Sequence, residues 1–477
     1  MIENLGREEL ALSDIGLFID FGSTYTKITA IDLDGEKVIG VSHSISTVNE
    51  DIMIGLRSAL EKLKADDRRL DGSEIRVKLA CSSAAGGLRL VVIGLVPNLT
   101  VKAAKLAALG AGAKVVGTYS YKLNHGEVAE MEQLFPDIIL LAGGTDGGNE
   151  EAIIHNAGML AKSNINVPVV VAGNKACAYD VKSILESNGR FVKVVENVFP
   201  ELGKLKVEPS RSAIREIFME RIVRAKGLDR AERFVGRILM PTPTAVLKAA
   251  ELLSTGAGEE KGFGELILID IGGATTDVHS IAQGHSTDPK VIEKGIPEPF
   301  AKRTVEGDLG IRYNALHILE TAGQEQILEN SLKLKPTVDI EKKVKYLSEH
   351  IEAVPEEGDD FYLDIGLART ACEIAIERHA GNIDQVLTPT GTIYTQFGKD
   401  LTEVKMIIGT GGIFAYGRDP LAVLEGVLFK PENPFSLRPK DPSFFIDKKY
   451  ILYSIGMLAE IEPEKALRIA KKYLLKV

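Results

Sequence analysis

Two stretches of the chain share one order of apolar and polar positions. Residues 266–269 are apolar and are followed by Asp270, two glycines and two hydroxyl residues, while residues 17–19 are followed by Asp20, a glycine and a hydroxyl cluster. A continuous apolar run of this kind predicts a strand buried on both faces. Because the two stretches align in one register from the aspartate onward, we predict two related half-molecules that face a shared cleft.

Each predicted strand ends in residues suited to phosphate and a metal ion. Glycine lets backbone N–H groups approach an anion, hydroxyl groups add donors, and a carboxylate can hold Mg²⁺ directly or through water. The predicted metal ligands are Asp20 and Asp270, and a general base for water is expected among these two and Asp277. The predicted phosphate contacts are Gly22, Ser23, Thr24, Lys27, Gly272, Gly273, Ala274 and Thr275. An exposed strand lysine is the alternative for Lys27.

A third apolar strand, residues 404–408, runs into the glycines Gly409, Gly411 and Gly412. In order and spacing, the three motifs resemble the first phosphate, second phosphate and adenosine motifs of the actin/Hsp70/sugar-kinase ATPases. This resemblance implies an α/β protein with the actin-like ATPase fold, in which two ribonuclease-H-like lobes close around Mg-ATP. It places the three glycines close to the adenosine.

The remaining pattern divides the chain into five parts. Residues 1–81 are expected to form the first part of the N-terminal ATPase lobe, with a tight turn between strands at Asp34-Gly35. Strand-like and helical segments alternate in the next part, which predicts an inserted α/β unit with a parallel sheet. The predicted parts after the first are the inserted unit at 82–200, a helical connection at 201–264, a second lobe with a helical insertion at 265–430 and C-terminal helices at 431–477.

Three further stretches carry candidate chemistry. Residues 143–149 of the insert, Gly-Gly-Thr-Asp-Gly-Gly-Asn, lie between a predicted strand and helix, where an open α/β sheet binds ligands; a glycine turn with a helix cap explains them equally well. Residues 302–312 either line the cleft or form a solvated loop. The stretch from Asp277 begins like the corrinoid-binding pattern Asp-x-His-x-x-Gly, but Ala282 stands in place of its glycine. We therefore do not assign His279 to cobalt.

Composition narrows the class of protein. The chain has 477 residues, enough for two large lobes with an insertion, and its net charge of −10 argues against a nucleic-acid surface. There is no apolar run of membrane-spanning length, so we expect no membrane segment and a cytoplasmic location. The cysteines are too few and scattered for a disulfide framework or a zinc site, and we expect Cys81, Cys177 and Cys372 to pack in the core in a reducing compartment.

Five motifs belong together, at residues 18–27, 141–149, 240–246, 270–279 and 304–310. They resemble the glutamate mutase accessory family, which is encoded beside adenosylcobalamin-dependent mutases, and the similarity spans nearly the whole chain. The resemblance implies a Mg-dependent ATPase that acts as a chaperone-like reactivating factor, with ATP and Mg²⁺ as cofactors and a mutase subunit as partner. It implies that damaged cobalamin is exchanged for intact cofactor. The alternatives are a small-molecule kinase of the same superfamily and a nucleotide-sensing scaffold without hydrolysis.

Overall fold

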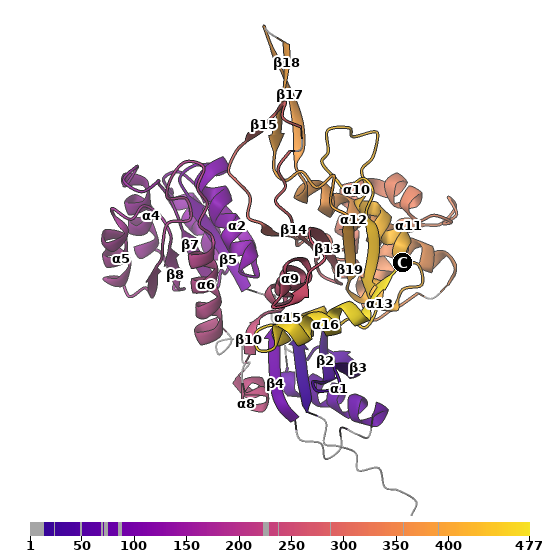
Figure 1. Ribbon diagram of the computed structural model, residues 1–477. Helices are drawn as coiled ribbons and strands as arrows, with labels where there is room; N and C mark the ends of the chain where they lie inside the picture. The colour runs from indigo at the N-terminus through magenta and orange to yellow at the C-terminus, as the bar shows by residue number, and fades with distance from the viewer. Residues whose placement is uncertain are drawn as a thin grey trace, which may run out of the picture.

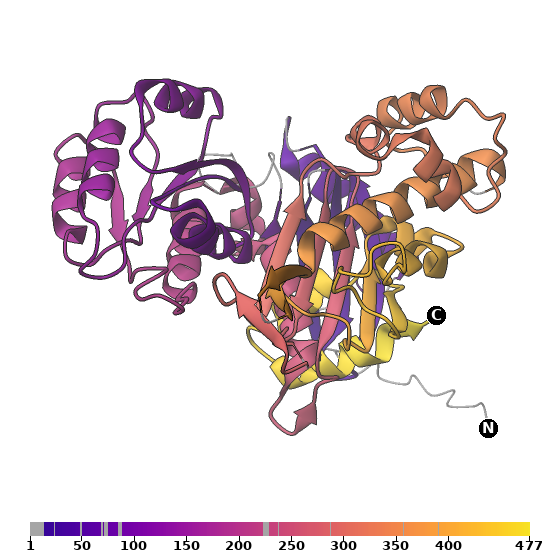
Figure 2. The same cartoon turned by 90° about the horizontal axis from the view of Figure 1, so that it is seen from above.

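Two mixed sheets stand at the centre of the molecule, and a third, parallel sheet lies to one side. Figure 1 shows the first sheet below the second and the parallel unit at the left, and Figure 2 shows the same three bodies from above. This computed structural model describes residues 14–477 except 23, 48–49, 68–69, 71–74, 84–87, 223–228, 237, 287, 356 and 390.

The first sheet has the order β10-β4-β1-β2-β3. Neighbours β1, β2 and β3 are antiparallel, whereas β4 runs parallel to β1 and β10 runs parallel to β4. Every residue of β1 is buried, as its continuous apolar run predicted. The helix α1 (Ile52–Asp66) covers β2 and β3. The strands are β1 (Ile15–Phe21), β2 (Tyr25–Asp32), β3 (Lys37–Ile45), β4 (Ile75–Ser82) and β10 (Ile238–Pro241).

The second sheet repeats this topology in the order β16-β14-β13-β19-β20, with β21 added at one edge. Here too the neighbours β16, β14 and β13 are antiparallel, whereas β19 runs parallel to β13 and β20 runs parallel to β19. The chain therefore has the actin-like ATPase fold, with two ribonuclease-H-like lobes. The strands are β13 (Leu266–Ile271), β14 (Thr276–Ile281), β16 (Ala301–Glu306), β19 (Met406–Thr410), β20 (Ser443–Asp447) and β21 (Leu474–Lys476).

The segment between the first lobe and the second corrects one expectation. Its pattern predicted a helical connection at 201–264, but β10 lies inside it and is the fifth strand of the first sheet. A strand of four residues is too short to show a period of two. The helical elements are α6 (Glu208–Ile217), η3 (Phe218–Ile222), α8 (Asp229–Val235) and α9 (Thr242–Thr255).

Each of two helices packs against the sheet of the other lobe. The helix α9 follows the first sheet in sequence but also packs against β13 and β14 of the second, and α15 (Leu452–Leu458) follows the second sheet but packs against β1 and β4. One shared cluster of buried side chains fills the space between them, with α16 (Pro463–Tyr473) on its outer side. The two lobes are therefore joined through a common core layer.

The inserted unit has a fully parallel sheet of the order β6-β5-β7-β8-β9, with crossover helices, as the alternating pattern predicted. The pattern did not reveal β9, which has only three residues. Its strands are β5 (Leu88–Gly94), β6 (Ala113–Ser120), β7 (Ile138–Leu141), β8 (Val169–Val171) and β9 (Val192–Val194). Its helices are η2 (Pro97–Val101), α2 (Lys102–Gly110), α3 (His125–Gln133), α4 (Glu151–Ala161) and α5 (Ala178–Glu186).

The remaining elements belong to the second half of the chain. The helix α12 packs against the second sheet, α10 packs against α12, and α11 packs against α10. A three-stranded sheet projects from the body at the top of Figure 1. Among the described residues, no helix is both long and apolar enough to cross a bilayer. All three cysteines are buried and free, as expected for core residues. These elements are α10 (Ala315–Asn330), α11 (Ile340–Glu349), α12 (Gly358–His379), β15 (Val291–Lys294), β17 (Asn382–Thr388), β18 (Gly391–Phe397), α13 (Gly412–Tyr416), α14 (Pro420–Leu424), η4 (Glu425–Val427), β11 (Gly256–Ala257) and β12 (Glu260–Lys261).

Candidate functional site

A cavity of about 640 Å³ lies between the two lobes, and both glycine turns line it. The turns lie close together, because a Cβ built on Gly273 would be 3.5 Å from Thr24 Oγ1. Ser23, which was predicted to contact phosphate, lies outside the described residues. The predicted site residues that line the cavity are Asp20, Gly22, Thr24, Lys27, Asp270, Gly272, Gly273, Ala274, Thr275, Asp277 and Gly412.

Two of the three glycines expected beside adenosine do not line the cavity. Gly409 is inside β19, where a Cβ would lie 2.8 Å from the Phe414 ring. Gly411 has a φ of +111°, and a Cβ there would lie 2.3 Å from the carbonyl oxygen of Ile271, so a side chain would force the two turns apart. Of the three, only Gly412 lines the cavity, at the start of α13.

The second turn presents backbone donors to the cleft. Gly272 closes the turn by donating its N–H to Thr275 O at 2.9 Å. Within the part of the chain that the structure describes, the N–H groups of Gly273, Ala274 and Thr275 have no acceptor. Consecutive N–H groups in such a turn form an anion-binding concavity.

The segment after β16 holds this turn in place. Arg312 and Tyr313 donate their N–H groups to Gly273 O at 3.0 and 2.8 Å. A Cβ built on Gly310 would lie 2.2 Å from the carbonyl carbon of Ala274, so glycine is required for this close approach. Since Arg303, Val305, Ile311 and Arg312 also line the cavity, the cleft interpretation of residues 302–312 is confirmed and the solvated loop is wrong.

Asp20 is buried at the end of β1 and is held on both oxygens. Lys27 Nζ lies 2.7 Å from Oδ2, and Thr242 donates its hydroxyl to Oδ1 at 2.5 Å. Although burial by itself lowers the pKa of Lys27, the facing Asp20 carboxylate raises this pKa well above its usual value. The ammonium also lies 3.9 Å from the centre of the Tyr450 ring. Lys27 is therefore a cleft residue rather than an exposed strand lysine.

Asp270 and Asp277 face each other across the β13–β14 pair. Arg303 donates to Asp277 Oδ2 through Nη2 at 2.7 Å and Nε at 3.1 Å, while the buried Oδ1 has no partner among the described residues. Burial and the neighbouring charge of Asp277 raise the pKa of Asp270 to about 7. Paired carboxyl groups with an unsatisfied buried oxygen fit a cation that would neutralise them.

The donor set fits Mg²⁺ bound together with a phosphate better than a site made of protein ligands alone. No group of three His, Cys, Asp or Glu side chains in the described ranges is arranged to hold a metal by itself. Mg²⁺ is commonly held by one or two carboxylates, water and substrate phosphates. Asp270 is the more available of the two predicted ligands, because Lys27 and Thr242 already engage Asp20.

Sequence reasoning missed several side chains of the cleft. Thr242, Tyr450 and Lys114 all line it, and the last comes from the inserted unit. Each is distant in sequence from the turn that it faces, so no local pattern marks it. Thr242 is the exception, because it begins α9 directly after a strand and lies in a Pro-Thr-Pro-Thr run that was noted only for its resemblance.

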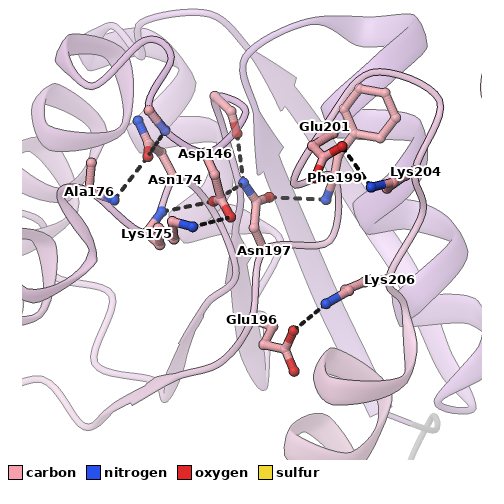
Figure 3. A network of polar contacts seen from close by, with 12 residues as sticks. Asp146, Asn174, Lys175, Ala176, Glu196, Asn197, Phe199, Glu201, Lys204 and Lys206 are labelled. Carbon is pink, nitrogen blue, oxygen red and sulfur yellow. Dashed lines mark hydrogen bonds and ion pairs between the residues drawn. The ribbon is translucent and has the colours of Figure 1, made fainter.

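The glycine loop of the insert lies apart from this cleft and is stabilised by its own contacts. Figure 3 shows Asn197 between Asp146 and Phe199, and the Asn197 amide donates to Gly144 O and Asp146 Oδ1, each at 3.0 Å. The Asn149 side chain accepts from Ala152 N at 3.1 Å. These contacts agree with the glycine turn and helix cap. His279, excluded as a cobalt ligand, is fully buried in β14.

Comparisons with known proteins cover nearly the whole chain. A family model described as MutL protein matches residues 16–474. Protein MutL of Clostridium tetanomorphum is 51% identical over 470 residues, which cover 97% of this chain and 100% of that protein.

Two solved structures are more distantly similar. Nucleotide-free acetone carboxylase aligns with 94% of this chain and 70% of its own at 13% identity and a TM-score of 0.38. The ethanolamine utilization protein EutJ of Carboxydothermus hydrogenoformans aligns with 95% of this chain and 89% of its own at 12% identity and a TM-score of 0.31. The family model and the full-length relative confirm the resemblance that the motifs indicated, and the chain belongs to the MutL protein family.

Proposed function

We propose that this protein is an ATP-dependent reactivating factor for an adenosylcobalamin-dependent mutase of the glutamate mutase type. The observation that carries the proposal is the single cavity lined by two glycine turns and by the carboxylates that end β1 and β13. Membership of the MutL protein family supports the choice of partner, through the resemblance of its motifs to the glutamate mutase accessory proteins. We propose that the protein exchanges damaged cobalamin by acting on a mutase subunit.

Different cleft residues are proposed to bind phosphate, hold the metal ion and orient the attacking water. Mg-ATP bound there would supply the phosphoryl group, with the metal ion neutralising its charge. The open N–H groups of the 272–275 turn hold phosphate oxygens, and Asp270 holds the metal ion. Asp277 orients the attacking water through Oδ1, because Arg303 fixes its other oxygen. Asp20 is positioned by Lys27 and Thr242 and acts through water.

ATP binding is proposed to change how the protein holds its partner. Since both lobes line one cleft, a ligand that contacts both turns favours their closed arrangement. Moving a partner-binding state from 1:99 to 99:1 requires about 5.5 kcal/mol of differential affinity. Closure is proposed to displace a mutase subunit so that inactive corrinoid leaves.

The test is phosphate release from Mg-ATP, measured for the protein alone and with a glutamate mutase whose cobalamin has been inactivated. We expect ATP-dependent recovery of mutase activity, and we expect both hydrolysis and recovery to be lost in Asp270→Ala. Asp288→Ala is the matched control, because Asp288 lies on an exposed turn away from the cleft, and it should behave like the wild-type protein.

Two other outcomes point to the alternatives. Turnover that requires a sugar or a carboxylic acid instead of the mutase would indicate a small-molecule kinase. Binding of ATP without phosphate release, alone or with the mutase, would indicate a nucleotide-sensing scaffold. Hydrolysis without recovery would retain the ATPase and reject glutamate mutase as its partner.

A further inference from the structure

The inserted unit reaches the cleft through the turn between α2 and β6. Gly112 and Lys114 line the cavity, although most of the unit lies to one side of the lobes (Figure 1). Gly112 has a φ of +88°, and a Cβ built on it would lie 2.5 Å from Thr244 Oγ1. Only glycine fits this position. The turn that precedes Lys114 therefore packs tightly against α9 and positions Lys114 at the cleft.

A buried arginine ties the same turn to the second lobe. Arg303 donates through Nη1 to Leu109 O at 3.0 Å and to Ala113 O at 3.4 Å, and through Nη2 to Asp277 Oδ2 at 2.7 Å. A cation at this place also meets the negative end of the α2 dipole. One guanidinium thus joins a carboxylate of the cleft to the end of the first helix of the insert.

The Lys114 ammonium lies beside Gly307, in the segment that follows β16. A Cβ built on Gly307 would lie 3.0 Å from Lys114 Nζ. The Asn314 amide donates to Gly307 O at 3.0 Å and to Ala274 O at 2.6 Å, and so joins this point to the turn. The ammonium and the open backbone N–H groups of this turn belong to residues that line the same cavity.

Lys114 also differs from the other cations of the cleft in its charge balance. Within the described residues it has no carboxylate partner, whereas the other lysine and arginine side chains that line the cavity are engaged. These are Lys27 with Asp20, Arg303 with Asp277, Arg312 with Asp364, and Arg418 in a further contact. A cation without a counter-ion in a cavity lined by phosphate turns is suited to bind an anion.

We propose that Lys114 binds the terminal phosphate of the nucleotide, so that the inserted unit senses whether this phosphate is present. The inference rests on the proposed function, because it requires a nucleotide in the cleft. The terminal phosphate of ATP pairs with the Lys114 ammonium, whereas ADP lacks this phosphate and leaves the ammonium without an anion. ATP therefore favours the position in which α2 and β6 pack against the cleft more than ADP does. By linkage, the position of the insert then reports to the mutase partner which nucleotide is bound.

The first experiment measures the affinities for Mg-ATP and Mg-ADP by calorimetry. Lys114→Met should weaken ATP binding roughly 10- to 100-fold, and ADP binding by less than about twofold, because one charged hydrogen bond to the terminal phosphate is lost. Lys114→Arg keeps the cation and should retain most of the preference for ATP. The control Lys122→Met removes an exposed charge from the same unit, where the lysine pairs with Glu151, and should change neither affinity.

The second experiment measures hydrogen exchange in α2. In the wild-type protein, ATP should protect the amide groups of α2 more than ADP does, and Lys114→Met should abolish this difference. If the wild-type protein binds Mg-ATP but Lys114→Met keeps the wild-type ratio of ATP to ADP affinity, the inference is overturned and the proposed function stands. If the wild-type protein does not bind Mg-ATP, both are overturned.

Discussion

At the scale of single residues, the cleft depends on side chains that position its carboxylates. Asp20 is almost fully buried, and a carboxylate in such a place needs partners on both oxygens to remain charged. Lys27 comes from the neighbouring strand of the same hairpin, so the sequence placed it correctly in the site. Thr242 comes from a helix that is 222 residues away, and only the fold revealed its contact.

Thr242→Val tests this contact with little change in volume. The variant removes the hydroxyl group that donates to Asp20 Oδ1 at 2.5 Å. We expect the rate of ATP hydrolysis to fall about tenfold, because a hydrogen bond to a charged group is lost. Thr255→Val is the control on the same helix, since the exposed Thr255 hydroxyl donates only to nearby backbone carbonyls, Glu251 O at 2.8 Å and Gly256 O at 3.4 Å. Equal rates in both variants would show that Thr242 does not position Asp20.

A second buried cation gives the protein a pH-dependent stability. Lys399 is 1% exposed and donates to Ala282 O at 2.6 Å and Phe300 O at 2.7 Å. Burial, reinforced by the positive charge of Lys302, lowers the pKa of Lys399 to about 7. The carboxylates of Glu298 and Glu265 act in the opposite direction, and the charge of Arg211 adds to the lowering.

The sign of the effect follows from proton binding. An unfolded lysine has a pKa of about 10.4, so between pH 7 and about 10.4 the unfolded chain binds more protons than the native protein. The contribution of Lys399 to the free energy of unfolding therefore rises with pH in this window, by up to about 1.4 kcal/mol per unit. Below pH 7 and above pH 10.4 it is constant.

Lys399→Met isolates this contribution. Urea titrations at pH 7.5, 8.5 and 9.5 should give a free energy of unfolding that rises more steeply with pH in the wild-type protein than in the variant. The loss of two hydrogen bonds lowers the stability of the variant at every pH and does not affect the slope. Parallel curves would contradict the lowered pKa of Lys399.

At the scale of elements, the lobes are joined where α9 and α15 cross. The helices touch backbone to backbone, because a Cβ built on Gly456 would lie only 1.7 Å from Ala245 O. The sequence predicted helices in both places, since each carries apolar positions at helical spacing. It did not predict their contact, because helical periodicity marks a buried face and not the partner that covers this face.

Gly456→Ala tests the crossing. The added methyl group forces the helices apart, and we expect the free energy of unfolding to fall by about 3 kcal/mol or more, together with weaker Mg-ATP binding as the lobes shift. Gly158→Ala is the matched control within α4, where a Cβ meets no atom within 4 Å. That variant should gain up to about 1 kcal/mol. Urea unfolding of both variants gives the comparison, and a stable Gly456→Ala protein would rule out the close crossing.

At the scale of the whole molecule, the repeat of one topology creates the cleft. The two sheets place equivalent strand ends, Asp20 of β1 and Asp270 of β13, on the same cavity. The inserted unit adds Gly112 and Lys114 to this cavity, and the flanking Ala111 and Ala113 belong to a buried cluster shared with the first lobe. The arrangement gives one site that three bodies of the chain can contact, which suits the proposed coupling of a nucleotide to a partner.

The sequence by itself determined the two motif strands, their glycine turns, the parallel insert and the family. These features follow from local periodicity and turn chemistry, which are written in neighbouring residues. Tertiary structure decided that β10 completes the first sheet, that Asp20 is held by Thr242, and that Arg303 contacts both Asp277 and Leu109, the latter 194 residues away from it. Such contacts depend on how separate elements pack, and no local pattern encodes the partner of a buried charge.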